Sequence, residues 1–361
     1  MCHYSDDLKK ISSFTINKSI MKSLKSIAIA LMAFGALAAQ AADVTPSNRY
    51  ITRKVNSGAF TAIRTNTSLD IVYTVGQRDI EIYAPDNLMP YIQVAIKGSE
   101  LIVSYKESMN IRGSHKSHIK ISAPDVNKFT TASAGDIDIK SNIRLNGKTV
   151  EMRVLSAGGI TAKAIEAADI RLQTNSAGDI ETGTLKAENV SLIVNSAGDI
   201  ETENVSARNR ASVSVNSAGD VEVPEIVAGE TVSLSTNSAG DIKITTVSAP
   251  SASISTNSSG DIRVSELKVN DVSASSGSSG NINLTGVCSS ANLSARSVGD
   301  INAKGLKAKD VDASVSSSGN VTCHAVNSLV ARRSSVGEIR YAGNPSTVKI
   351  ESNRKDGVRP L

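Results

Sequence analysis

Short runs of alternating apolar and polar residues flank a recurring glycine through residues 131–348. Counted from each glycine as position zero, position +2 is Ile or Val in every copy. Positions −8, −6 and −4 are apolar or small, with polar residues between them. A period of two on both sides of the glycine predicts β-strands, and the repeats contain no apolar stripe with the 3.6-residue period of a helix.

The glycine belongs to a pattern of Ser, a small residue, Gly, Asp or Asn, and Ile or Val that recurs eleven times. The glycines are Gly135, Gly158, Gly178, Gly198, Gly219, Gly240, Gly260, Gly280, Gly299, Gly319 and Gly337. Their spacing of 18 to 23 residues predicts a solenoid, because so short a coil buries its apolar row only by stacking on its neighbours at about 4.8 Å. We therefore expect an all-β fold, a parallel β-solenoid of about eleven 20-residue coils, right-handed as parallel crossovers nearly always are.

Different composition on either side of the repeats predicts three parts in the exported chain. Residues 43–130 hold most of its aromatic side chains and show strand alternation, so they are expected to form a β-rich cap on one end of the solenoid. The solenoid itself is assigned to residues 131–348, and Tyr341 takes an inward position in the last coil. Residues 349–361 are expected to form a polar tail.

Residues 1–41 are interpreted as an upstream extension followed by a secretory signal peptide. A basic segment beginning at Met21, an apolar run from Ile27 to Ala38 and small residues at Ala39 and Ala41 have the order typical of such a leader. Met21 is then the expected initiator, with cleavage after Ala41. The apolar run is too short to span a bilayer, so we expect no integral membrane segment in the mature chain and a location in the periplasm, on the outer-membrane surface or outside the cell.

The charge of the chain argues against nucleic acid as a partner. The formal net charge is +4, but residues 1–41 contain five lysines and two aspartates, which leaves the mature chain at +1. Aromatic residues make up 3% of the sequence and Trp is absent, so side chains that could stack on bases are scarce.

The two cysteines of the mature chain are expected to stay unpaired. The repeat register places Cys288 on an outward position and Cys323 on a core position, in coils separated by one intervening coil. Stacking alone would then hold them farther apart than the roughly 7 Å that a disulfide permits between Cα atoms.

An acidic residue follows most of the repeat glycines and would form a row along the stack. The row includes Asp179, Asp199, Asp220, Asp241 and Asp261. One interpretation is turn chemistry, in which each carboxylate accepts backbone N–H groups and stays solvated. The alternative is a series of divalent-cation sites with oxygen ligands from adjacent coils, although calcium-binding solenoid repeats are richer in Gly and Asp. No other metal site and no cofactor are expected.

Serine and asparagine residues form two further predicted rows. Ser at position −2 occurs in all eleven copies and is expected to be a buried hydroxyl that hydrogen-bonds beside the turn. Positions −5 and −3 are expected to face outward and to form a flat uncharged surface. That surface contains Asn175, Asn195, Asn216, Asn237, Asn257, Ser214, Ser235 and Ser255. It is either a solvated β-face or a contact surface for glycan hydroxyls, another protein or an ice lattice.

No catalytic residues are predicted. A nucleophilic serine would need a base to distinguish it from the other copies, and the repeats contain a single histidine, His324. Enzymatic β-helices that act on polysaccharides use long loops to wall a cleft, and the even spacing of the glycines leaves no room for such loops.

The chain resembles the head GIN domain family of auto-transporter adhesin heads, which is common in exported proteins of Bacteroidetes. The resemblance rests on Asn56-Ser-Gly-Ala-Phe-Thr-Ala-Ile, Val75-Gly-Gln, Asn87-Leu-Met-Pro-Tyr-Ile, Leu101-Ile-Val-Ser and the Ser-Ala-Gly-Asp-Ile repeats. It covers about residues 48–348 and implies a β-solenoid in an exported protein. About 20 residues follow the last coil, too few for a membrane translocator, so we do not expect the chain to export itself.

These observations favour a non-catalytic exported interaction protein, an adhesin-like head that presents a flat Ser, Asn and Asp surface to a glycan or an extracellular protein. The alternatives are a structural protein of the cell envelope or periplasm and, with less support, a β-helix enzyme that acts on polysaccharides.

Overall fold

The computed structural model describes residues 42–106, 109–352 and 355–361. The predicted signal peptide, residues 1–41, lies outside the described residues. The chain divides into two compact units. In the small unit, β1 (Ala42–Val44) pairs in parallel with β8 (Met109–Ile111), and the Arg112 guanidinium lies 2.8 Å from the Asp43 carboxylate. The larger unit contains all the other strands.

Strands of the larger unit fall into an N-terminal group, a repeat group and a terminal group. The N-terminal group is β2 (Tyr50–Lys54), β3 (Ala62–Thr65), β4 (Asp70–Val75), β5 (Asp79–Pro85), β6 (Ile92–Lys97), β7 (Glu100–Tyr105) and β9 (His118–Ala123). The repeat group begins with β10 (Lys128–Thr131), β11 (Ile137–Ile139), β12 (Ile143–Val154), β13 (Ile160–Ala162), β14 (Ile165–Thr174), β15 (Ile180–Thr182), β16 (Leu185–Val194), β17 (Ile200–Thr202) and β18 (Asn204–Val215). It continues with β19 (Val221–Ala228), β20 (Thr231–Thr236), β21 (Ile242–Ser248), β22 (Ser251–Thr256), β23 (Ile262–Lys268), β24 (Asp271–Ser276), β25 (Ile282–Ala295), β26 (Ile301–Val315) and β27 (Val321–Arg333). The terminal group is β28 (Ile339–Ala342), β29 (Thr347–Ser352) and β30 (Val358–Pro360).

Helix is almost absent from these residues. The structure has two 3-10 turns within its described part, η1 (Met89–Tyr91) and η2 (Lys355–Gly357). No helix among the described residues is long and apolar enough to cross a membrane.

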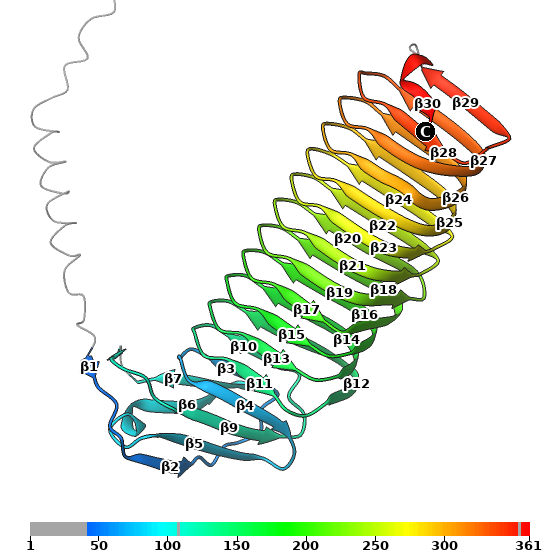
Figure 1. Ribbon diagram of the computed structural model, residues 1–361. Coiled ribbons are helices and arrows are strands. Elements are labelled where there is room, and N and C mark those ends of the chain that lie inside the picture. The colour runs from blue at the N-terminus through cyan, green and yellow to red at the C-terminus, as the bar shows by residue number, and fades with distance from the viewer. Residues whose placement is uncertain (1–41, 107–108, 353–354) are drawn as a thin grey trace, which may run out of the picture. The chain divides into compact units, whose positions relative to one another are not determined.

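The repeats form the predicted parallel β-solenoid, with about twelve turns. Each strand pairs in parallel with the equivalent strand of the next coil, as β15 does with β17 and β20 with β22 (Figure 1). The pairing keeps the repeat in register, so that Ile180 lies opposite Ile200. Equivalent side chains therefore stack in rows along the solenoid.

The row at position +2 forms the centre of the core, as predicted. All eleven of its side chains are at most 1% exposed. They are Ile137, Ile160, Ile180, Ile200, Val221, Ile242, Ile262, Ile282, Ile301, Val321 and Ile339. Position −4 is a second inward row, which contains Val and Thr in most coils, with Ser276, Ala295 and Arg333 in three of the later ones. The apolar alternation in the sequence thus corresponds directly to the dry interior of the coils.

Parallel stacking extends into the region that was expected to be only a cap. The pair β3 and β4 lies against β10 and β11 in parallel, and β7 and β9 lie against β3 and β4 in the same way. Antiparallel strands β2, β5 and β6 follow beyond them. Tyr73 and Phe129 are fully buried with their rings 5.1 Å apart, but β4 and β10 have parallel partners on both sides, so these rings lie inside the stack and not at its end.

Residues 349–361 were expected to form a polar tail, but the strands described within this range pair with the last coil. Strand β29 pairs with β27 and β30 pairs with β28, both in parallel. Val358 is buried, and Tyr341 packs partly buried against the core. Ile350 also packs partly buried against the core, so strand pairing and these apolar contacts hold the segment on the last coil.

The prediction that Cys288 faces outward is wrong, because its coil is one residue shorter than its neighbours. Leu284 and Gly286 of β25 pair with Val264 and Leu267 of β23. One residue separates the pair on β25, and two residues separate the pair on β23. The missing residue shifts the phase, so Val287 lies opposite two outward lysines and is 53% exposed. Cys288 instead faces the core and is buried like Cys323, and both are free thiols.

Replacing Ile242 with Asp should destabilise the solenoid strongly, by about 4 kcal/mol or more, since it places an unpaired charge in the apolar interior. Equilibrium unfolding in urea would measure the loss. Thr245→Asp is the matched control, because Thr245 is an exposed residue of the same strand, β21. An Ile242→Asp protein that unfolds like its parent would show that position +2 does not face inward.

The thiols should react with a disulfide reagent only after unfolding. Burial raises the pKa of Cys288 to about 11 and that of Cys323 to about 12. Thiolate is therefore scarce near pH 8, and in protein that begins at residue 42 two thiols should be counted in denaturant but almost none in the native state. Because the folded-state pKa values are raised, protonation of the two buried thiols contributes to the free energy of unfolding. This contribution is complete below the ordinary thiol pKa of 9.0 and is lost as the pH rises through the folded-state pKa values. A bridge between the two cysteines in mass spectrometry would contradict the register.

Candidate functional site

Successive glycine turns approach each other closely along one edge of the coils. The Gly240 N–H donates to the Ser217 carbonyl oxygen at 2.7 Å. A Cβ added at Gly240 would lie 2.0 Å from the Gly219 carbonyl oxygen, and equivalent conflicts recur at the other repeat glycines. The backbone approach excludes any side chain, which explains the glycine in every copy.

The prediction of a buried hydroxyl at position −2 is wrong, because the serine side chains there are only half-buried. Their backbone carbonyls, as in Ser217, receive the glycine N–H of the next coil. The buried hydroxyls lie instead at position −4, where Thr236 donates to the Gly260 carbonyl oxygen at 3.2 Å. The sequence contains this signal as Thr among the valines of that row.

The acidic row forms a continuous ladder between coils. The Asp199 N–H donates to the Asp179 carboxylate at 2.8 Å, and the Asp220 N–H donates to the Asp199 carboxylate at 2.7 Å. Asp241 and Asp261 continue the ladder at 2.8 and 2.7 Å. Carboxylates about 4.8 Å apart repel by only about 0.9 kcal/mol in a water-like dielectric, less than the roughly 1.5–3 kcal/mol of a charge-assisted hydrogen bond. The ladder can therefore stabilise the stack despite the like charges.

The same oxygens are the ones that a cation seam would use. In each of these ladder steps one carboxylate oxygen accepts the N–H of the next coil. Within the described ranges, no group of three or more His, Cys, Asp or Glu side chains is placed to hold a metal ion. A cation seam over Asp179 to Asp261 would bind through the second carboxylate oxygen of each residue or the remaining lone pair of the bonded one.

The predicted Asn and Ser surface is also laddered. The side-chain amide of Asn195 donates to that of Asn175 at 2.7 Å, and the contact repeats at 2.7 Å through Asn216, Asn237 and Asn257. Ser235 bonds Ser214 at 3.2 Å, and Ser255 lies opposite Ser235 in the next coil. The structure thus places the three serines on neighbouring strands and each asparagine directly after the end of a strand, so that all eight residues lie in rows along the stack. Each amide has a second N–H available to a partner.

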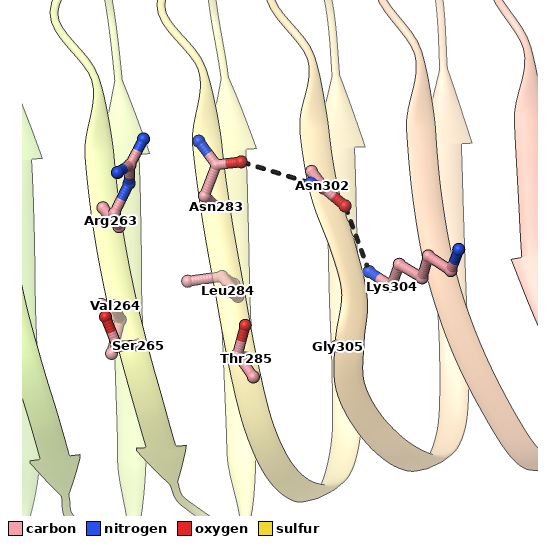
Figure 2. A pocket seen from close by; sticks show the side chains of 9 residues that line it. All are labelled: Arg263, Val264, Ser265, Asn283, Leu284, Thr285, Asn302, Lys304 and Gly305. Atoms are coloured by element: carbon pink, nitrogen blue, oxygen red, sulfur yellow. Dashed lines mark hydrogen bonds between the residues drawn. The ribbon is translucent and has the colours of Figure 1, made fainter.

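A hollow of about 530 Å³ on another side of the coils was not predicted. It lies over β23, β25 and β26, and Figure 2 shows the side chains of Arg263, Asn283 and Asn302 projecting from these successive strands. Val264 and Leu284 line it from buried positions. Serine and threonine hydroxyls and Lys304 complete its edge.

The hollow coincides with the short coil. Strand β25 has one residue fewer at this corner than β23 before it and β26 after it. A shorter coil recedes between two longer ones, as in the two-against-one arrangement of a β-bulge. Gly286 permits the tight corner with φ of +136°, where a Cβ would lie 2.1 Å from the Leu267 carbonyl oxygen. The spacing of 19 residues between Gly280 and Gly299 was the available signal in the sequence.

The charge of the hollow differs from that of its neighbour along the stack. None of the nine residues that line it is acidic, and the set includes Arg263 and Lys304. A second hollow of about 300 Å³ is lined by Glu181, Glu201 and two further glutamates. The same side of the solenoid therefore changes from acidic to basic along its length.

Replacing Gly159 with Asn should fill the one gap in the acidic row and stabilise the protein. Gly159 has no side chain that could accept the Asp179 N–H, although its own N–H donates to the Asp136 carboxylate at 2.7 Å. An added Cβ would lie 3.3 Å from the Asp179 carbonyl oxygen, so a small shift accommodates it. Gly159→Asn should exceed Gly159→Ala by about 1 kcal/mol in urea unfolding, the value of one hydrogen bond. Equal stabilities would contradict a stabilising ladder.

Millimolar calcium should leave the melting temperature nearly unchanged if the acidic row only forms turn hydrogen bonds. Calorimetry with and without calcium would test this. A saturable rise of several degrees that disappears in the Asp220→Ala, Asp241→Ala double variant would establish the cation seam instead.

Several solved structures resemble the chain. A protein described as "a putative adhesin" from Bacteroides fragilis has 21% identity and a TM-score of 0.30, over 88% of this chain and 100% of that one. Another "putative adhesin" from Parabacteroides merdae has 18% identity and a TM-score of 0.30, over 89% and 100%. A "putative lipid binding protein" from Parabacteroides distasonis has 15% identity and a TM-score of 0.27, over 88% and 99%. The search of curated proteins finds no match.

A family comparison gives a match over most of the described chain. The family described as "Putative auto-transporter adhesin, head GIN domain" matches residues 59–244 and 224–345. The matched residues include the N-terminal coils, all eleven repeat glycines and the strands that form both hollows. With its fold and its sequence pattern in agreement, the chain belongs to the head GIN domain family of adhesin-like proteins.

Proposed function

We propose that the chain is a non-catalytic exported interaction protein, which presents the outer surface of its solenoid to a glycan or an extracellular protein. The observation that carries this proposal is the row of Asn175, Asn195, Asn216, Asn237 and Asn257, whose amides are fixed by hydrogen bonds at 2.7 Å while each has a further N–H to offer. A partner can bind such a surface without first ordering its side chains, so the entropic cost of binding is low.

The regular coils favour interaction over catalysis. Parallel pairing from β10 to β30 leaves only short connections between the strands, while β-helix enzymes that act on polysaccharides build their cleft from long loops. The single histidine of the repeats, His324, lies opposite Lys307 and Ala342, so neither of these paired positions supplies a carboxylate that would orient it as a general base. The adhesin description of the family supports the same preference.

A structural role in the cell envelope is the second candidate. The ladders of Asp and Asn use much of the polar capacity of two outward rows to hold the coils together. A protein whose surface rows serve only its own stability would need no external partner. Location separates this alternative from an adhesin-like role.

The test is to fractionate the native organism and treat intact cells with protease. The proposal expects the protein on the outer surface, where protease removes it, and expects the purified protein to bind immobilised glycans, matrix protein or cells. Protection from protease within the periplasm, together with no binding to any of these surfaces, would contradict the proposal and support the structural role.

A further inference from the structure

We propose that the hollow over β23, β25 and β26 is a binding subsite for an anionic group of a glycan, a carboxylate or a sulfate. This inference rests on the proposed function and specifies the class of partner. Carboxylate and sulfate share the chemistry that matters here, an exposed oxyanion on a polar ring.

Arg263 supplies the principal charge of the subsite. Its side chain is exposed, and within the described part of the chain it takes part in no ion pair. The neighbouring cations are neutralised, because Lys243 lies 2.7 Å from the Glu222 carboxylate and Lys268 lies 2.7 Å from the Glu266 carboxylate. A planar guanidinium with five N–H donors matches the geometry of an oxyanion.

Neutral donors lie beside this guanidinium. Figure 2 shows Arg263 and the Asn283 amide projecting side by side from adjacent strands. The Asn283 amide oxygen accepts the Asn302 amide at 3.3 Å, which fixes its orientation and leaves its nitrogen free to donate. The Asn302 oxygen in turn accepts the Lys304 backbone N–H at 3.4 Å. The donors are thus held in place before any ligand arrives.

Lys304 adds a second, mobile charge. Its side chain is exposed at the edge of the hollow and extends away from Asn302 in Figure 2. A four-carbon stem with free rotation can bring the ammonium toward an anion held at Arg263. Since no acidic residue lines the hollow, nothing there competes with the ligand for either cation.

Size and lining fit a sugar unit. The volume of about 530 Å³ is within the roughly 300–1,000 Å³ typical of small-ligand sites. Val264 and Leu284 are only 1% and 2% exposed, so the surface that a ligand meets is formed by the polar side chains around them. The acidic hollow lined by Glu181 and Glu201 should repel the same ligand, so the basic end of this side would be selected.

Calorimetry with a matched pair of probes tests the subsite directly. Hexagalacturonate and its methyl ester have the same sugar rings and differ in charge, and a sulfated galactan oligosaccharide supplies the sulfate arm. The free acid should bind at least about tenfold more tightly than the ester, and salt should weaken its binding. Preference for the sulfated probe over the free acid would identify sulfate as the source of the oxyanion, and the reverse preference would identify carboxylate.

Two variants place the binding in the hollow. Arg263→Gln should weaken binding of the charged probe about tenfold, and Ser265→Glu, at an exposed position on the edge, should abolish it because the new carboxylate repels the anion. Arg208→Gln is the matched control, because Arg208 is exposed in β18 and does not line the hollow. Melting curves show whether each variant is folded. If Arg263→Gln does not fold, the binding measured with Ser265→Glu still tests whether the probe occupies the hollow.

Three outcomes would overturn the subsite: equal binding of acid and ester, no binding of any anionic probe, or undiminished binding by both hollow variants. Binding of neutral glycans or of matrix protein under those outcomes would leave the proposed interaction function intact. If the protein binds none of the glycans and no matrix protein, that result would contradict both the subsite and the proposed interaction function.

Discussion

The close approach of successive glycine turns sets the geometry on which the rest of the structure depends. Each turn donates its glycine N–H to the preceding coil and has its Cα against the preceding glycine carbonyl, where a side chain would overlap the backbone. That contact fixes the coils at strand spacing along one edge. Equivalent positions then stack, which aligns the buried isoleucines at +2 and the polar ladders outside.

Rigidity and recognition are connected through the same stacking. The ladder from Asn175 to Asn257 orders an outward surface because each amide is held by its neighbour in the next coil. The hollow at Arg263 lies where one coil is a single residue shorter than its neighbours, so that the neighbouring strands project beyond it. A regular scaffold therefore provides an extended surface, and a coil that is one residue shorter coincides with the basic hollow.

The repeat made the fold predictable, and exceptions to the repeat limited the prediction. Period-two alternation around each glycine identified the solenoid and the burial of Ile242, since stacking converts sequence position into spatial position. The phase of Cys288 was predicted wrongly because counting from Gly280 assumed a full-length coil. Ser217 was placed inside for a similar reason, since periodicity alone does not show that the turn tilts its side chain outward. The hollow was missed because it depends on the difference between three adjacent coils, which the pattern of one coil does not contain.

Equilibrium unfolding of Gly240→Ala tests the central claim most directly. The added Cβ would lie 2.0 Å from the Gly219 carbonyl oxygen, which neither coil can relieve without separating. Gly58→Ala is the matched control, because its Cβ would have ordinary contact at 3.8 Å. We predict a loss of about 3 kcal/mol or more for Gly240→Ala and little change for Gly58→Ala. Equal stability of the two variants would contradict the dependence of the solenoid on the glycine contact.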